Sequence, residues 1–162
     1  MIIIDVLGTP APKGSSRAML IGGRARVIAS SSGANAKKQA AWVKAVQAAA
    51  KCEVITGPVW VSVTFRLARP KHHYGKRGLR ESAPLHPTVY PDIDKLARTT
   101  LDALTGLAFE DDSRIVSLYV GKQYAVPGRA GAMVKVGAWL TETISESGKR
   151  AFFDLWESER AA

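Results

Sequence analysis

The chain lacks several features that would place it in a specialised class of protein. Its 162 residues contain one cysteine, Cys52, which excludes an intrachain disulfide and a cysteine-based zinc cluster. The apolar start reaches Asp5 almost at once and has no basic lead, so it is not a signal peptide. No stretch approaches the roughly 18 uninterrupted apolar residues of a membrane span. We therefore expect a soluble, cytoplasmic protein that forms one domain over residues 1–162, with no membrane contact and no organic cofactor.

Acidic residues are scarce in the first half of the chain. Residues 1–91 hold 14 Lys or Arg against three acids, and no acid occurs between Asp5 and Glu53. Residues 92–162 hold nine basic against 11 acidic residues, and the whole chain has a net charge of +9. A field of this kind attracts polyanions, of which nucleic acid is the commonest in a cell. The alternative is a solvated basic face that only keeps the protein soluble.

Hydrophobic periodicity predicts an α/β (α+β) fold with a small mixed β-sheet flanked by helices. In the first half we expect a loop over Thr9–Gly23, which is rich in Gly, Pro and Ser, and an N-cap for the first helix among Ser30–Gly33. The expected elements there are a strand over Ile2–Leu7, a short strand around Arg26–Ala29, a helix over Ala34–Lys51 and a half-buried strand over Pro58–Ala68.

A long loop without structure of its own is expected from Arg69 to Pro91, and loops of this length are usually functional or disordered. The segment Arg66–Arg80 carries six Lys or Arg, two His and a Tyr with no acid, which is typical of a phosphate-binding surface. We assign DNA contacts to Arg66, Arg69, Lys71, His73, Lys76, Arg77, Arg80 and the later Lys122.

A second helix is expected to begin at Asp92, because Pro91 excludes a helical Tyr90 and aspartate is a good N-cap. Its apolar stripe comprises Ile93, Leu96, Ala97, Thr100, Leu101 and Leu104. The remaining expected elements are a strand over Ile115–Ala125, a strand over Ala132–Leu140 that pairs with it as a hairpin, and a closing helix over Ser147–Arg160.

Two pairs of carboxylates flank this second helix. Asp92 and Asp94 lie at its start, and Asp111 and Asp112 lie at the mouth of the following strand. We expect the strand–helix–strand path to bring both pairs to one end of the sheet. A cluster of carboxylates without cysteine or histidine suits Mg²⁺, with Mn²⁺ as the alternative ion. The competing interpretation is a plain N-cap followed by a solvated acidic turn.

The residues around these carboxylates resemble the RusA family of Holliday junction resolvases, in its phage-type branch. The similar segments are His86–Leu96, with Pro91-Asp92-Ile-Asp94, then Leu101–Gly106, and then Glu110–Val116 with Asp111-Asp112. The resemblance implies a homodimeric, Mg²⁺-dependent endonuclease that places two symmetric cuts in a four-way DNA junction. The essential carboxylates of the family fall on Asp92, Asp94 and Asp112, and Asp102 matches a structural aspartate.

Two positions depart from the pattern of the family. The residue after Asp94 is Lys95 in place of the usual asparagine, and the family's lysine falls on Arg98. An arginine replaces that lysine if only positive charge is needed, but not if the group must exchange a proton, because the pKa of arginine exceeds about 12. In the second case Lys95 would take over the role.

From these observations we predict a metal-dependent crossover junction endonuclease of DNA recombination and repair. The predicted catalytic residues are Asp92, Asp94, Asp112, Arg98 and Lys95, and the predicted metal ligands are Asp92, Asp94 and Asp112 together with Asp111. The alternatives are a non-catalytic basic DNA-binding protein and a metal nuclease that acts on other branched DNA such as flaps or forks.

Overall fold

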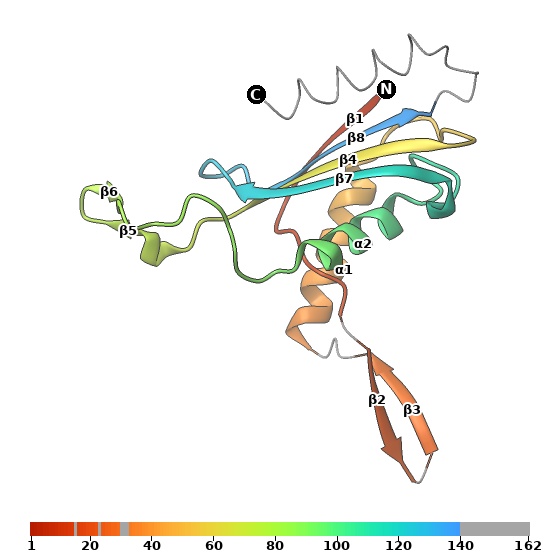
Figure 1. Ribbon diagram of the computed structural model, residues 1–162, viewed down its shortest axis with the longest axis horizontal. Coiled ribbons are helices and arrows are strands. Elements are labelled where there is room, and N and C mark those ends of the chain that lie inside the picture. The colour runs from red at the N-terminus through yellow and green to blue at the C-terminus, as the bar shows by residue number, and fades with distance from the viewer. Residues whose placement is uncertain (15, 23, 30–32, 140–162) are drawn as a thin grey trace.

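The computed structural model describes residues 1–14, 16–22, 24–29 and 33–139. Its centre is a four-stranded mixed sheet with the strand order β1-β8-β4-β7, covered on one face by two helices (Figure 1). The predicted α+β class, with a small mixed sheet and flanking helices, is confirmed. These elements are β1 (Ile2–Leu7), α1 (Ala34–Ala49), β4 (Val59–Leu67), α2 (Ile93–Leu104), β7 (Ile115–Tyr124) and β8 (Gly131–Ala138). Neither helix in the described part of the chain has the length and apolarity that crossing a bilayer requires.

Strand β4 is the centre of the core. Its alternate residues Val59, Val61, Val63, Phe65 and Leu67 are each at most 9% exposed, whereas the residues between them are half-buried on the other face. The predicted period-two strand is therefore confirmed. β4 pairs in parallel with β7 on one side and antiparallel with β8 on the other. A strand this apolar gains most from a central position, where neighbours cover both of its edges.

The predicted hairpin between the last two strands is wrong, because β4 lies between them. β8 pairs with β1 and β4, and β7 pairs with β4 alone. The connection over residues 125–130 crosses the end of β4, where the backbone N–H of Ala125 donates to the Leu67 carbonyl at 2.8 Å. Six residues easily span the roughly 10 Å between alternate strands of a sheet. A short turn between two strands is thus not sufficient evidence that they pair.

The predicted loop over Thr9–Gly23 is wrong in its second half. β2 (Ser16–Ile21) and β3 (Arg24–Ala29) form an antiparallel ribbon, which stands apart from the main sheet (Figure 1). The short strand predicted around Arg26–Ala29 is confirmed as part of β3. The missed signal is Gly22-Gly23 between two runs of β-forming residues, since Gly-Gly is a typical two-residue hairpin turn. Gly22 has the positive φ of 59° that such a turn requires.

The loop predicted over residues 69–91 forms a projecting arm with short elements of its own, so its expected lack of structure is also wrong. A 3₁₀ turn over Lys71–His73 precedes β5 (Tyr74–Gly75), which pairs with β6 (Gly78–Leu79). We call residues 69–91 the arm. The chain leaves β4 into the arm and returns from it directly into α2 (Figure 1).

Three further expectations concern the helix ends and the tail. The N-cap of α1 is Gly33, the last residue of the Ser30–Gly33 segment predicted to supply the cap, and residues 30–32 lie outside the described part of the chain. The closing helix predicted over Ser147–Arg160 also lies outside them. The N-cap predicted for α2 is confirmed at Asp92, whose backbone is extended, although its side chain does not cap the helix.

Gly131 marks the closest backbone approach within the sheet and gives a test of the fold. A Cβ atom there would lie 1.8 Å from the Val6 carbonyl oxygen, whereas one at Gly128 would meet nothing within 4 Å. Both glycines have positive φ, so both alanine variants carry backbone strain, but only Gly131→Ala adds a clash. We expect Gly131→Ala to lower the free energy of unfolding by at least about 2 kcal/mol more than Gly128→Ala, measured by urea denaturation. Equal losses would contradict this β1–β8 packing.

Candidate functional site

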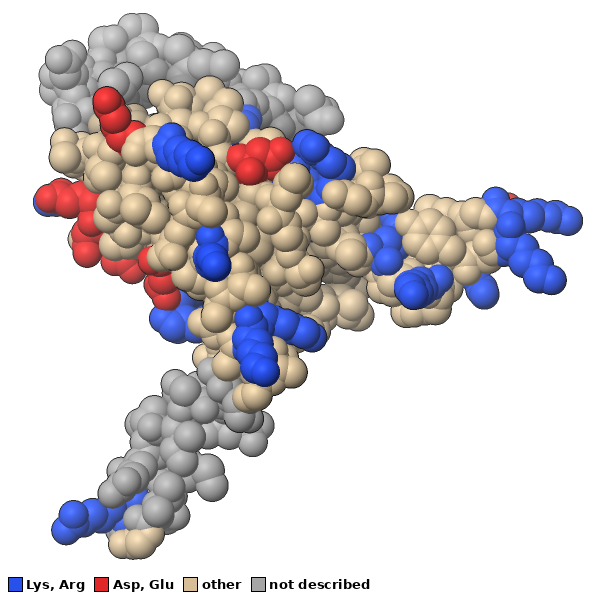
Figure 2. Space-filling model, turned by 180° about the vertical axis from the view of Figure 1, so that it is seen from behind, with Lys and Arg blue, Asp and Glu red and all other residues tan. Residues whose placement is uncertain are grey.

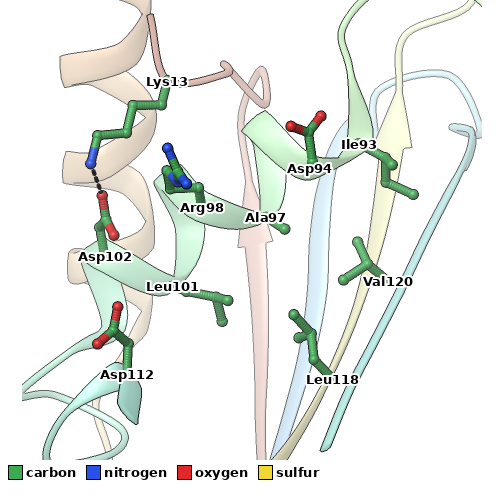
Figure 3. Close-up of a pocket in the computed structure, with 10 residues that line it drawn as sticks. All are labelled: Lys13, Ile93, Asp94, Ala97, Arg98, Leu101, Asp102, Asp112, Leu118 and Val120. Carbon is green, nitrogen blue, oxygen red and sulfur yellow. Dashed lines mark hydrogen bonds and ion pairs between the residues drawn. The ribbon is translucent and has the colours of Figure 1, made fainter. Parts of the chain in front are cut away.

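A pocket of about 610 Å³ opens between α2 and the edge strand β7 (Figure 3). Its apolar wall comes from both elements and comprises Ile93, Ala97, Leu101, Leu118 and Val120. Charged side chains complete the lining, namely Lys13, Asp94, Arg98, Asp102 and Asp112. The pocket therefore joins residues from the N-terminal segment, the second helix and the start of β7.

The sequence of α2 explains why these charges face the pocket. Leu96, Thr100 and Leu104 are fully buried on the side that packs against the core. The Trp42 indole Nε1 of α1 donates to the Thr100 hydroxyl at 3.1 Å and so fixes the rotation of α2. Asp94, Arg98 and Asp102 follow one another at four-residue intervals and share the opposite face. The predicted amphipathic helix is thus confirmed, and its polar face is a row of alternating charge.

Asp92 lies at the start of α2 but does not line the pocket. Its carboxylate accepts from the Lys95 ammonium at 2.8 Å. The hydrogen bond and charge of Lys95 lower the pKa of Asp92, with a smaller contribution from Lys122, and Asp92 in turn raises the pKa of Lys95. Both side chains are more than a third exposed, so the pair adds little to stability. Lys95, one of the predicted catalytic residues, is thus engaged with a predicted metal ligand.

The expectation that both pairs of carboxylates meet at one end of the sheet is wrong for a single chain. β4 and β7 are parallel, so the helix that connects them must run in the opposite direction. Asp92 and Asp94 therefore lie at one end of α2, and Asp111 and Asp112 lie beyond its other end (Figure 3 shows Asp94 and Asp112). The helix axis between Asp94 and Leu104 alone measures about 15 Å.

The donor set is all oxygen, as Mg²⁺ and Mn²⁺ prefer, but one chain does not arrange it as a metal centre. In the part of the chain that the structure describes, no group of three or more His, Cys, Asp or Glu lies close enough to hold a metal ion. Asp111 is instead the N-cap of a 3₁₀ turn over Asp112–Arg114 and accepts from the Ser113 backbone N–H at 2.9 Å. Hydrogen bonds with the Ser113 side chain and then with its backbone lower the pKa of Asp111.

Lys13 is a pocket residue that the sequence marks only as one of four basic residues, with Arg17, Lys37 and Lys38, that could bind phosphate in place of the arm. Its backbone N–H donates to the Lys95 carbonyl at 3.1 Å, which ties the N-terminal segment to α2. Its ammonium pairs with Asp102 at 2.5 Å (Figure 3). The sequence signal was only a basic residue in a segment rich in Gly and Pro, and nothing in it indicated contact with a helix 80 residues later.

The basic residues predicted to bind DNA fall into two groups. Lys71, Lys76 and Arg77 are exposed on the arm and have no partner among the described residues. Figure 2 shows Lys and Arg side chains gathered on this arm, while the acidic side chains lie mostly on the body of the molecule. These three side chains are free to meet phosphates.

The other predicted DNA contacts hold the arm in place. The Arg69 guanidinium donates to the Pro84 carbonyl at 2.8 Å and lies 3.9 Å from the centre of the Tyr124 ring. Arg80 donates to the Tyr74 carbonyl at 3.2 Å. The Lys122 ammonium of β7 donates to two carbonyls immediately before Asp92, those of Val89 at 2.9 Å and Pro91 at 3.0 Å. These contacts connect the arm to the sheet and fix its exit into α2.

The side chains of two further residues predicted to contact DNA are largely buried. Arg66 is 14% exposed and donates to the Asp5 carboxylate and to the Val6 carbonyl. His73 is 8% exposed and packs edge-on against Tyr124, with ring centres 5.6 Å apart. Burial, followed by the positive charges of His72 and Arg69, lowers the pKa of His73. The buried imidazole packs at the base of the arm.

The fold and the pocket together define a basic α+β protein with a row of acidic and basic side chains beside a cationic arm. Residues 8–136 match the family of the endodeoxyribonuclease RusA. The match covers most of the chain, so the protein belongs to the RusA endodeoxyribonuclease family, and the resemblance seen in the sequence is confirmed.

A curated relative is similar over part of the chain. The protein YqaN of Bacillus subtilis (strain 168), described as uncharacterized, is 35% identical over 85 residues. The matched region covers 51% of this chain and 60% of YqaN, so the chain spans well under two thirds of the relative that it matches. This similarity therefore adds no activity to the family assignment.

The pairing of Asp92 with Lys95 can be measured directly. Replacing Lys95 by methionine removes the hydrogen bond and the charge that hold the Asp92 pKa below its ordinary value. We expect the pKa of Asp92 to rise in Lys95→Met and to stay unchanged in Lys44→Met, an exposed lysine of α1. Carboxyl ¹³C NMR titration of the metal-free protein reports both. An unshifted Asp92 titration in Lys95→Met would show that this ion pair does not form in solution.

Proposed function

We propose that this protein is a structure-selective DNA endonuclease that cuts branched DNA, including four-way junctions, as a homodimer. Membership of the RusA endodeoxyribonuclease family supports the reaction class. The observation that carries the proposal is the α2–β7 pocket, whose lining includes Asp94, Arg98 and Asp112, three positions that match the motif of the family. The unpaired cations of the arm are suited to hold the DNA backbone, which carries charge but no base sequence.

The separation of the carboxylates along α2 supports the proposed dimer. A C₂ axis that sets the α2 helices of two copies antiparallel would bring Asp94 of one copy near the partner's Asp112. β7 supports contact between copies, because it is an edge strand whose Val116, Leu118 and Tyr119 are each about half exposed. We assign Asp92, Asp94, Asp111 and Asp112 as the groups that would hold Mg²⁺ once both ends of α2 meet in the dimer.

The first experiment is a substrate panel with the wild-type protein. Four-way junctions, flaps, forks and linear duplexes are incubated with Mg²⁺, Mn²⁺ or EDTA, and the products are mapped on sequencing gels. Paired, symmetric nicks in the junction that require the divalent ion are expected. Cuts confined to flaps or forks would favour a metal nuclease that acts on these branched substrates and not on four-way junctions. Binding without any cut would favour a non-catalytic DNA-binding protein. The observation in favour of this second candidate is that the described residues of one chain do not bring three carboxylates together.

Neutralising one carboxylate should remove cleavage and spare binding. We expect Asp94→Asn or Asp112→Asn to reduce single-turnover nicking by at least about 100-fold, because each change deletes a proposed metal ligand. Affinity for the junction should stay equal or increase, because a negative charge near the phosphates is lost. Gel shift in EDTA and cleavage in Mg²⁺ measure the two effects separately.

Mixing the two variants tests whether the site is shared between subunits. In a shared site, a heterodimer of Asp94→Asn with Asp112→Asn contains one intact Asp94–Asp112 combination and one doubly defective one. Mixed and refolded subunits should therefore regain nicking of one strand. If each copy cut with its own residues alone, both sites of the heterodimer would be defective and no activity would return. Light scattering that shows only a 17.4 kDa monomer would also contradict the dimer.

The arm gives an independent prediction on DNA binding. Replacing Lys71, Lys76 and Arg77 by alanine removes up to three phosphate contacts, and log K falls with log salt by about 0.9 per contact on duplex DNA. The triple variant should flatten that slope by roughly two to three, for branched and linear DNA alike. Lys37, Lys38 and Lys44, exposed on α1, form the matched control, since their removal changes the net charge equally. If the salt slope of the arm variant equals that of wild type, the arm is only a solvated basic segment, and a flatter slope in the α1 variant would then place the phosphate contacts at Lys37 and Lys38.

A further inference from the structure

We propose that Lys13 and Arg98 form a phosphate-binding pair at the rim of the α2–β7 pocket, and that its ligand is one phosphate of the DNA backbone. This rests on the proposed function only in taking DNA as the ligand. The arm described above would hold the DNA at a distance from the pocket, whereas this pair would hold it at the pocket itself.

Lys13 lines the pocket and contacts α2 through both its backbone and its side chain. Its backbone is fixed to the first turn of α2 through the hydrogen bond to the Lys95 carbonyl. Its side chain reaches Asp102, seven residues further along the same helix, which is about two turns. Lys13 therefore lies along the polar face of α2 and crosses the level of Arg98 (Figure 3).

Arg98 has a charged group free for a ligand. It stands between Asp94 and Asp102, four residues from each, yet it makes no ion pair with either among the described residues. In Figure 3 its guanidinium lies on the same side of α2 as the Lys13 side chain. A guanidinium presents a planar fork of donors that matches two phosphate oxygens, and an ammonium adds a compact charge beside it.

The Asp102 carboxylate forms an ion pair with the Lys13 ammonium when no phosphate is bound. The pair is exposed at both ends, with 45% of the Lys13 side chain and 41% of the Asp102 side chain accessible. An ion pair of this exposure contributes little, so its lysine can exchange partner when a phosphate arrives. In this interpretation Asp102 is a positioning residue, because it keeps Lys13 extended along α2 and directed across the pocket.

A chemical cycle between one side chain and one phosphate tests the pair without any cleavage. Four-way junctions that carry a single neutral methylphosphonate, placed at successive positions around the branch point, are bound in EDTA by wild type, Lys13→Gln and Lys44→Gln. At one position wild type and Lys44→Gln should lose roughly 3- to 10-fold in affinity, while Lys13→Gln loses nothing further there. At the other positions all three proteins should respond alike. Lys13→Arg keeps the positive charge. Like wild type, it should lose affinity when the methylphosphonate is placed at that one position.

The outcomes separate this proposal from the proposed function. If Lys13→Gln responds like wild type at every phosphate, Lys13 does not bind the backbone and the pair is overturned, whether or not the wild-type protein nicks DNA. If the coupling appears but wild type cuts no branched substrate in Mg²⁺, the phosphate site stands and the nuclease assignment fails. A matching cycle with Arg98→Gln should single out the same phosphate or its direct neighbour, and a distant position would also overturn the pair.

Discussion

The direction of α2 is the constraint on which the arrangement of the site depends. β4 and β7 pair in parallel, so the chain must return along the sheet between them, and α2 provides the return. The residues before the helix and the residues after it consequently lie at opposite ends of the sheet. The same path places the arm at one end, since it occupies the connection from β4 to α2. Topology, and not local sequence, thus decides which charged groups of one chain can act together.

Packing fixes the helix in that direction. Leu96 and Leu104 are fully buried, and Trp42 of α1 reaches across to Thr100. Burial of side chains of this size contributes roughly 1.5–3 kcal/mol each, far more than the exposed ion pairs on the opposite face. The apolar side of α2 therefore holds the helix in place, and the polar side is left to carry Asp94, Arg98 and Asp102 for other purposes.

The sequence was informative wherever one physical pattern dominated a segment. The period of two in β4 and the apolar stripe of α2 predicted their elements, because burial on one face determines both. The β7–β8 hairpin failed because pairing depends on which strand is most apolar overall, which adjacent segments do not reveal. The β2–β3 ribbon was missed because the loop was predicted from the total Gly, Pro and Ser content of the segment. That total did not reveal Gly22-Gly23 as a hairpin turn. The residue types of the candidate site were readable from the family pattern, but their separation along α2 required knowing that β4 and β7 are parallel.

Counting charge did not distinguish cations that hold the protein together from those free for a ligand. The side chains of Arg66 and Lys122 donate hydrogen bonds within the chain, whereas those of Lys71 and Lys76 have no partner among the described residues. A count of basic residues treats all four alike. The difference arises from neighbouring carbonyls and carboxylates that fold onto them from distant positions. Only three-dimensional contacts separate these roles.

The ribbon of β2 and β3 has a consequence for how such proteins diverge. It is inserted between β1 and α1 and stands apart from the main sheet (Figure 1), so the four-stranded core does not depend on it. Insertions and deletions are tolerated best where few contacts would be lost. In the sequence it begins at Ser16, shortly after Lys13, which lines the pocket. Evolution can therefore lengthen, shorten or recharge this ribbon without altering the fold that builds the pocket.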